Sequence, residues 1–361
     1  MYQSTPTLRS STSNKIPQFT PSLTAMTATT TPYLTSLQRD GFVRIPSLLT
    51  PEEITHFRTI ATETTHLTRK GQWPHFRTVP KQFPPWPSTA PPASEGGIWG
   101  VQHLLHPDMP HRTDFARFYF SDKVLAVAEE LLGVTGSCTA RDNDTTEEPL
   151  VMELFNLLVA PETKDFALRW HRDDIPEHVS EDEEMRLLHQ KSPHGRQSHA
   201  QYNLALCADR SLIVVPGSHR RVRTEVERTA DPYAPELPGQ LVVELKPGDA
   251  VFYDSNILHR GVYRAKPEGQ EEEPRLTLHG SIGLKAAGDD AAAAAGANGE
   301  EGAAGGSAAG KVRATAVLQH GVGAWVRRED AAFGIGERAE RMRANLVAMG
   351  SGDGVGFSLQ G

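Results

Sequence analysis

The stretch LVVELKPGDAVFYDSNILHRGVYR, residues 241–264, decides the fold of this chain. It contains an apolar strand, a Pro-Gly-Asp turn, a second apolar strand with His259 beyond its end, and the short strand GVYR. Similar short strands surround it: AQYNLALC (200–207), SLIVVPG (211–217) and RLTLHGSIGL (275–284). Closely spaced strands between Gly and Pro turns predict a mainly β fold, an antiparallel sandwich or barrel.

Helix signals flank these strands. The stretch SLQRDGFVRIPSLLTPEEITHF (36–57) predicts a short helix, a turn, the strand FVRI and a second helix. Thr50, Pro51 and Glu53 form a capping box with proline at the first helical position. Further signals predict a helix over 121–133, capped by Ser121 and ended by Gly133, a buried strand over 151–161, an irregular aromatic-rich region over 71–112 and a final helix over 336–350.

Two segments have compositions that do not favour a packed core. Residues 1–30 are rich in Ser and Thr and contain no acidic residue, which is typical of either a disordered leader or a mitochondrial transit peptide. Residues 286–311 are a low-complexity Ala/Gly stretch, which we expect to be a disordered insertion. The sequence therefore predicts one domain over residues 31–350, interrupted by this insertion.

Overall composition excludes several classes of protein. The formal net charge is −8, and no basic stripe points to a nucleic-acid partner. No apolar run reaches the length of about 20 residues that spans a membrane. Cys138 and Cys207 form neither a disulfide framework nor a zinc cluster, which favours a reducing compartment. We expect an intracellular protein, cytoplasmic unless the leader directs it to mitochondria, of undetermined oligomeric state.

A candidate metal site begins in RWHRDDIPEHVS, residues 169–180. His171 and Asp173 are two residues apart, so on an extended segment both side chains project to the same side. By itself this pattern is weak, because it arises often by chance and a charged surface loop is its more common source. His259 is the candidate for a third ligand, since a histidine at the end of a barrel strand can point into the mouth of the barrel.

Polar residues alternate with leucines along RLTLHGSIGL. Arg275, Thr277 and His279 share one face of this strand, opposite Leu276 and Leu278. An arginine that faces the interior of a barrel is costly unless an anion meets it. Arg275 is therefore a candidate for binding an anionic ligand.

These motifs, in this order, resemble the phytanoyl-CoA dioxygenase family of iron- and 2-oxoglutarate-dependent oxygenases. The resemblance covers roughly residues 35–285. The stretches that carry it are DGFVRIPSLLTPEEI, then H-R-D at 171–173, SLIVVPGSHR, LKPGDAVFYDSNILHRGVY and an arginine on the next strand. It implies a double-stranded β-helix (a jelly-roll, cupin-like core), with His171, Asp173 and His259 as iron ligands and Arg275 on the distal carboxylate of 2-oxoglutarate.

The chemistry of these residues agrees with what the resemblance implies. Two imidazoles and one carboxylate bind Fe(II) and leave positions open for 2-oxoglutarate and O2. The planar fork of an arginine suits a bidentate pair with the distal carboxylate. In the family, 2-oxoglutarate is converted to succinate and CO2 while a substrate is hydroxylated. Related halogenases lack the carboxylate ligand, so the presence of Asp173 argues against halogenation.

The sequence also departs from the family pattern. The stretch between His259 and Arg275 is longer than usual, and Arg260 and Gly261 follow the histidine where a small hydroxyl residue is common. Thr277 is a candidate to supply that hydroxyl. Asn156, Gln201 and Asn203 are further candidates for contacting the co-substrate, with the alternative that they are polar groups satisfied inside the barrel.

Other polar residues near the motifs have weaker claims. Asp174 should point away from Asp173 on an extended segment, and His219 in the PGSH turn is expected to be structural. The charged segment around 178–199 is expected to be either a mobile lid or a solvated loop.

The sequence leaves three functions open. The first is a 2-oxoglutarate-dependent dioxygenase acting on a small organic molecule, a lipid or a secondary metabolite. The second is a non-catalytic, cupin-like metal-binding or sensor protein, for which a buried arginine spaced for a dicarboxylate has no purpose. The third is a structural zinc site, which usually has four ligands rich in cysteine.

Overall fold

The computed structural model describes residue 1 and residues 31–81, 87–134, 148–191, 197–265, 274–285 and 308–351. Contacts divide the chain into Met1–Thr31 and Pro32–Gly361, and the helices and strands all belong to the second unit. The predicted leader over 1–30 lies, apart from Met1, outside the described residues. Both expectations for it remain predictions.

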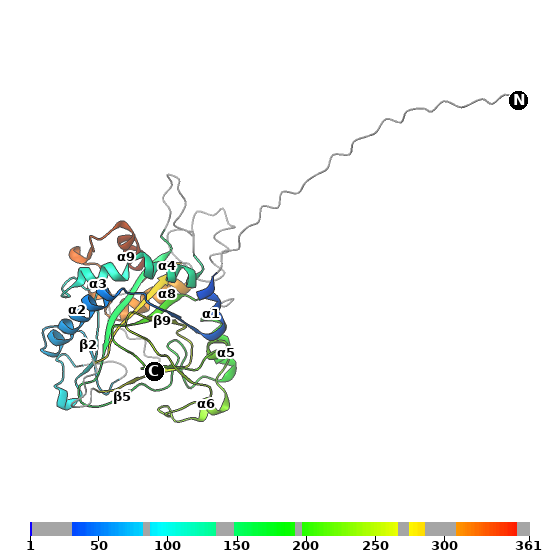
Figure 1. Ribbon diagram of the computed structural model, residues 1–361, viewed down its shortest axis with the longest axis horizontal. Coiled ribbons are helices and arrows are strands. Elements are labelled where there is room, and N and C mark those ends of the chain that lie inside the picture. Colours follow the sequence, from blue (N-terminus) through cyan, green and yellow to red (C-terminus); the bar gives the residue numbers. More distant parts are fainter. Residues whose placement is uncertain are drawn as a thin grey trace. The chain divides into compact units, whose positions relative to one another are not determined.

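The strands form two antiparallel sheets (Figure 1). The larger sheet has the order β1-β9-β6-β11-β4-β3-β2, and the smaller one β5-β10-β7-β8. From β4 onward the chain passes repeatedly from one sheet to the other, which is the double-stranded β-helix. The strands are β1 Phe42–Ile45, β2 Phe76–Thr78, β3 Ile98–Val101, β4 Leu150–Val159, β5 Phe166–Ala167, β6 His199–Ala205, β7 Leu212–Val214, β8 Leu241–Val242, β9 Ala250–Tyr253, β10 His259–Tyr263 and β11 Leu276–Leu284. The predicted fold class is confirmed.

One face of the larger sheet packs against helices (Figure 1). Apolar residues at most 2% exposed cover this face, among them Phe155, Tyr202, Leu204, Leu278 and Ile282. The helices are α1 Pro32–Asp40, α2 Pro51–Arg69, α3 Arg112–Tyr119, α4 Asp122–Leu132, α5 Glu181–Lys191, α6 Glu225–Thr229, α8 Ala308–Gln319 and α9 Glu337–Met349, with short 3-10 turns η1 Ala93–Glu95, η3 Ser218–Arg220, η4 Val322–Ala324 and η5 Glu329–Ala331.

The opposite face of the same strands is polar. His279 lies directly beside Asn156 of β4 and Asn203 of β6 in the register of the sheet. Thr277 is on the same strand, two residues before His279. Because successive side chains of a strand point to opposite faces, the apolar face packs on the helices while these polar side chains face the inside of the β-helix. The site is built on this inner face.

Local signals predicted most of these elements correctly. Thr50 and Glu53 form the capping box of α2, and Gly133 ends α4 in the left-handed region at φ 71°. Gly248 turns the chain before β9 at φ 87°, where a Cβ atom would lie 3.0 Å from the carbonyl oxygen of Leu49. Ser121 is the N-cap residue of α4, as predicted, but its hydroxyl donates to the carbonyl oxygen of Phe118 and makes no cap hydrogen bond.

Two regions differ from expectation. Residues 71–112 are not wholly irregular, since β2 and β3 lie within them and extend the sheet beyond β4. The predicted Ala/Gly insertion ends too late, because α8 begins at Ala308 and Gly310 is buried. A Cβ atom at Gly310 would lie 2.8 Å from the carbonyl oxygen of Lys285. Residues 286–307 of the insertion lie outside the described residues.

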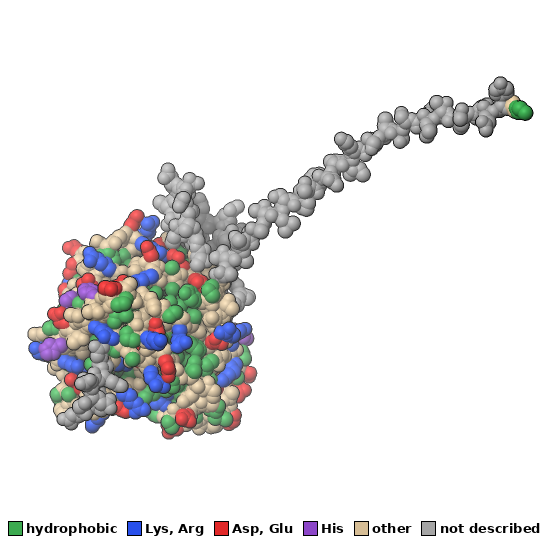
Figure 2. Space-filling model, viewed as in Figure 1, with side chains coloured by type: hydrophobic (Ala, Val, Ile, Leu, Met, Phe, Trp, Pro, Cys, Tyr) green, Lys and Arg blue, Asp and Glu red, His purple; other side chains and the backbone are tan. Residues whose placement is uncertain are grey.

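The charge distribution on the surface and the length of the helices agree with what the composition predicts. Acidic and basic side chains are interspersed on the face shown in Figure 2. Among the described residues, the search for a long, apolar, membrane-spanning helix finds none.

Candidate metal centre

His171, Asp173 and His259 come together at one point of the barrel. The Nε2 atom of His171 lies 3.4 Å from Oδ1 of Asp173, and that of His259 lies 3.7 Å from the same oxygen. The two imidazole ring centroids are 4.4 Å apart. Within the ranges that the structure describes, this is the group of His, Cys, Asp and Glu side chains close enough to share one metal ion.

Backbone pairing fixes the three residues relative to one another. His171 and His259 exchange backbone hydrogen bonds, each 3.0 Å long, and the amide of Asp173 donates to the carbonyl oxygen of Ser255 at 2.8 Å. The segment after β5 is therefore attached to the turn that leads into β10. This pairing explains how residues 88 positions apart, His171 and His259, reach the same ion.

Both histidines hydrogen-bond through Nδ1 and turn Nε2 toward Asp173. Nδ1 of His171 lies 2.7 Å from the carbonyl oxygen of Arg169, and Nδ1 of His259 lies 2.9 Å from that of Ile257. A carbonyl oxygen only accepts, so each Nδ1 carries the proton and each Nε2 keeps its lone pair. Burial, together with the neighbouring His171, lowers the pKa of His259 to about 4. The donor set fits a divalent cation such as Fe(II).

Asp173 is held as a carboxylate. Burial by itself would raise its pKa, but His259, His171 and a hydrogen bond from Gln201 hold the pKa of Asp173 far below its usual range. Nε2 of Gln201 donates to Oδ2 of Asp173 at 2.9 Å. Oδ1, the oxygen nearer the histidines, is thus the one that faces a metal ion. Gln201 contacts a predicted ligand directly, so it orients the metal site.

The residue between the first two ligands anchors this segment from behind. The Arg172 side chain is fully buried, and its Nε donates to Glu184 of α5 at 3.0 Å. Glu184 also pairs with Arg223 and Arg228. The expectation of a solvated loop is wrong for residues 181–191, which form a helix bearing this buried carboxylate. His194 of the same segment lies outside the described residues.

Arg275 and Thr277 meet at a carboxylate that sequence analysis did not single out. Nε of Arg275 donates to Oδ2 of Asp209 at 2.9 Å, and the hydroxyl of Thr277 donates to the same oxygen at 2.5 Å. The inward-facing arginine is thus met by an anion within the chain. The co-substrate roles of Arg275 and Thr277 remain predictions.

The other candidates form a row across three strands. Oδ1 of Asn203 accepts from Nδ1 of His279 at 2.8 Å, and Oδ1 of Asn156 accepts from the amide of His103 at 3.0 Å. Nδ2 of Asn156 is buried and has no hydrogen-bond partner among the described residues. An unpaired buried donor is costly, so this amide is suited to a ligand oxygen. Direct contact of Asn156 or Asn203 with the co-substrate stays a prediction.

No pattern in the sequence singled out Arg77, which lies on β2. Its guanidinium carbon lies 5.1 Å from the ring centroid of Trp99, and Gly100 leaves room for its stem. Burial lowers the pKa of Arg77, opposed by Tyr263, Tyr253 and Asp173, so its charge lies within electrostatic range of the metal-ligand carboxylate. A strand that joins the sheet only through tertiary pairing leaves little signal in sequence.

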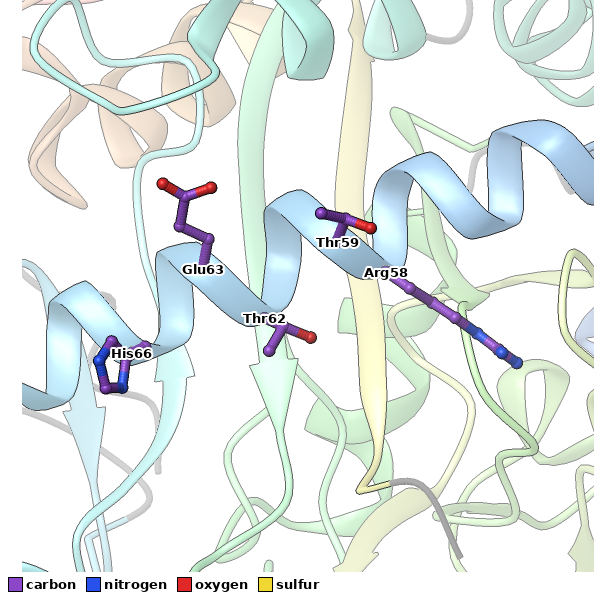
Figure 3. Close-up of a pocket in the computed structure, with 5 residues that line it drawn as sticks. All are labelled: Arg58, Thr59, Thr62, Glu63 and His66. Carbon is purple, nitrogen blue, oxygen red and sulfur yellow. The ribbon is translucent and has the colours of Figure 1, made fainter.

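The remaining candidates lie away from the ligand atoms. Asp174 accepts a hydrogen bond from the hydroxyl of Ser255 at 2.7 Å. His219 is buried against Gly41, with Nε2 3.2 Å from the carbonyl oxygen of Gln38. Figure 3 shows a shallow pocket along α2, lined by Arg58, Thr59, Thr62, Glu63 and His66. None of these lining residues belongs to the candidate metal centre.

Comparison with known proteins identifies the family. The sequence model of phytanoyl-CoA dioxygenase matches residues 37–262, and no curated protein matches. Three of the solved structures that are similar to this chain are AviO1, EctD and SnoN. AviO1 from Streptomyces viridochromogenes Tue57 is 17% identical with a TM-score of 0.46, over 70% of this chain and 93% of that one. EctD from S. alaskensis, with 2-oxoglutarate and 5-hydroxyectoine, is 18% identical with a TM-score of 0.44, over 70% and 75%.

The third is the non-heme α-ketoglutarate-dependent epimerase SnoN from nogalamycin biosynthesis, 17% identical with a TM-score of 0.44, over 70% of this chain and 80% of that one. The family match spans well over half of the chain, and the chain has both the antiparallel core and the His-Asp-His cluster. The chain belongs to the phytanoyl-CoA dioxygenase family of iron- and 2-oxoglutarate-dependent oxygenases.

Proposed function

We propose that this protein hydroxylates a small organic molecule, a lipid or a secondary metabolite, at a metal centre formed by His171, Asp173 and His259. The overall reaction converts substrate, 2-oxoglutarate and O2 into hydroxylated substrate, succinate and CO2. The observation that carries the proposal is the three-residue cluster, in which the Nε2 atoms of two imidazoles and one ionised carboxylate converge on one point.

Fe(II) held there by His171, Asp173 and His259 would supply, with 2-oxoglutarate and O2, the oxidising chemistry that hydroxylating a C–H bond requires. The residues of the chain bind the metal and orient the co-substrates. Three protein ligands leave open positions for the co-substrates, and Gln201 keeps one oxygen of Asp173 turned toward the metal. The charges of Arg77 and Arg275 favour a dianionic co-substrate beside the metal.

The alternatives that sequence left open predict different measurements. A structural zinc site would use a closed set of four ligands, and Cys207 lies in the hydrophobic core rather than beside the cluster. A non-catalytic sensor would bind iron without consuming 2-oxoglutarate. Turnover therefore separates the proposal from both alternatives.

The test is succinate release by the iron-loaded protein with lipid and metabolite extracts, with mass spectrometry to find products that have gained one oxygen atom. Asp173→Ala and His259→Ala should each lose most bound iron after anaerobic loading. Asp174→Ala is the matched control, since it removes a neighbouring carboxylate that contacts Ser255. Full iron occupancy in Asp173→Ala and His259→Ala, or equal loss in Asp174→Ala, would show that the ligand assignment is wrong.

A further inference from the structure

Arg275 and Asp209 form a buried ion pair between the two sheets. The Arg275 side chain is 10% exposed and that of Asp209 is 5% exposed, and Nε of Arg275 lies 2.9 Å from Oδ2 of Asp209. The guanidinium carbon also lies 4.5 Å from the ring centroid of Tyr263. The Arg275 side chain is therefore held by Asp209 along the Nε edge of its guanidinium and by Tyr263 across one face.

Asp209 is itself held in one orientation. Its Oδ1 accepts from both the amide, at 2.8 Å, and the hydroxyl of Ser211, and its Oδ2 accepts from Thr277 as well as Arg275. Its backbone pairs with Leu245 through hydrogen bonds of 3.0 and 2.9 Å. A carboxylate with donors on both oxygens has no freedom to turn away, so it transmits its orientation to the guanidinium.

One nitrogen of the guanidinium is buried without a partner. Nη1 of Arg275 is buried and has no hydrogen-bond partner among the described residues. Because an unsatisfied buried N–H of a charged group is costly, such a donor is retained where a ligand completes it. The ring centroid of Tyr253 lies 5.4 Å from that of His259. Burial raises the pKa of Tyr253, Asp173 raises it further and Arg275 opposes the shift, so Tyr253 is within electrostatic range of both the metal site and the ion pair.

We propose that Asp209 is a positioning residue that turns Arg275 so that Nη1 meets the distal carboxylate of 2-oxoglutarate. The inference rests on the proposed function and adds to it a residue that acts through Arg275. Asp209 holds the Nε edge, and the carboxylate of the ligand takes Nη1. The hydroxyl of Thr277, which sequence suggested as a direct contact of the co-substrate, acts through Asp209 as well.

Two effects of Asp209 on co-substrate affinity oppose each other. Its negative charge repels a dianion, so its loss alone would tighten binding. Its hydrogen bond orients the arginine, so its loss would weaken binding. A bidentate arginine–carboxylate pair depends on geometry, and we therefore expect the loss of orientation to dominate.

The experiment titrates two 2-oxo acids into the anaerobic Fe(II) protein and follows the metal-to-ligand charge-transfer absorption. One acid is 2-oxoglutarate, and the other is 2-oxobutyrate, which lacks the distal carboxylate. Arg275→Leu should raise the Kd of 2-oxoglutarate by about one to two orders of magnitude, and Asp209→Asn by about tenfold. Neither change should alter the Kd of 2-oxobutyrate, and the double variant should bind 2-oxoglutarate no more weakly than Arg275→Leu alone.

Each result other than these has a distinct meaning. Tighter or unchanged 2-oxoglutarate binding in Asp209→Asn, with weakened binding in Arg275→Leu, overturns the positioning role and leaves the proposed function intact. Equal loss of both 2-oxo acids means that Asp209 only supports the fold, which also overturns it. Absence of 2-oxoglutarate binding by the unaltered protein is instead a failure of the proposed function.

A milder variant covers the possibility that Asp209→Asn does not fold. Ser211→Ala removes one of the hydrogen bonds that orient Asp209 and leaves its charge in place. It should raise the Kd of 2-oxoglutarate by about two- to threefold without changing that of 2-oxobutyrate. No change in Ser211→Ala would contradict the inference independently.

Discussion

Removing the buried carboxylate of Glu184 should destabilise the protein more than any surface change on the same helix. Glu184 and Arg172 are fully buried, and Arg223 is 5% exposed. Burial lowers the pKa of Arg172 to about 10, with Glu184 opposing that shift. In Glu184→Ala, the buried guanidinium groups of Arg172 and Arg223 lose the carboxylate that pairs with them. Arg172 also anchors the segment that holds His171 and Asp173.

The expected magnitude follows from these contacts. Removing one partner of a buried ion pair costs about 3–5 kcal/mol of unfolding free energy. Arg172 keeps hydrogen bonds to the carbonyl oxygens of Ser218, Asn256 and Arg221, so we expect a loss within that range rather than one such penalty for each arginine. Glu184→Gln keeps an acceptor but no charge, and should lose roughly 2–3 kcal/mol.

The assay is urea unfolding of the iron-free protein, which separates fold stability from metal binding. The matched control is Glu183→Ala, one residue away. Glu183 pairs with Arg186, and their side chains are 40% and 58% exposed respectively, so this substitution should leave the unfolding midpoint unchanged. Equal midpoints for Glu184→Ala and Glu183→Ala would refute the reasoning. Fe(II) affinity should also fall in Glu184→Ala, because Arg172 lies between two ligands.

Three further outcomes are expected. Gln201→Leu should lower Fe(II) affinity by about 10- to 100-fold, measured by anaerobic titration, because it frees Oδ2 of Asp173. Deleting residues 288–306, which spares α8, should leave the melting temperature and 2-oxoglutarate turnover unchanged. The pKa of His106 is lowered by burial from 6.5 to about 4, so its neutral form contributes stability above pH 6.5 that is lost as the pH falls toward 4. Urea midpoints should therefore fall with pH less steeply in His106→Gln, whereas His178→Gln, at an exposed side chain, should keep the original slope.

Short-range patterns in the sequence determined the elements and the ligand set. The capping box at Thr50 and Glu53 and the turn at Gly133 each involve groups within a few residues, so their hydrogen bonds can be inferred without a fold. The spacing of His171 and Asp173, and the histidine that opens β10, likewise depend only on strand geometry and motif order. These signals predicted an antiparallel sandwich or barrel, and the resemblance to the phytanoyl-CoA dioxygenase family implied the double-stranded β-helix and the full ligand set.

Only the tertiary structure decided which charges meet. Asp209 and Arg275 are 66 residues apart, and Glu184 lies in a segment whose composition suggested solvent. Arg77 comes within electrostatic range of Asp173 because β2 and β3 extend the sheet beyond β4, and α8 forms where Ala314, Val317 and Leu318 are buried. Because the chain passes repeatedly from one sheet to the other, residues far apart in the sequence lie on one inner face. An unpaired buried charge is costly, so the charged residues on that face lie next to groups of opposite charge. Residue spacing along the chain does not encode such a pairing.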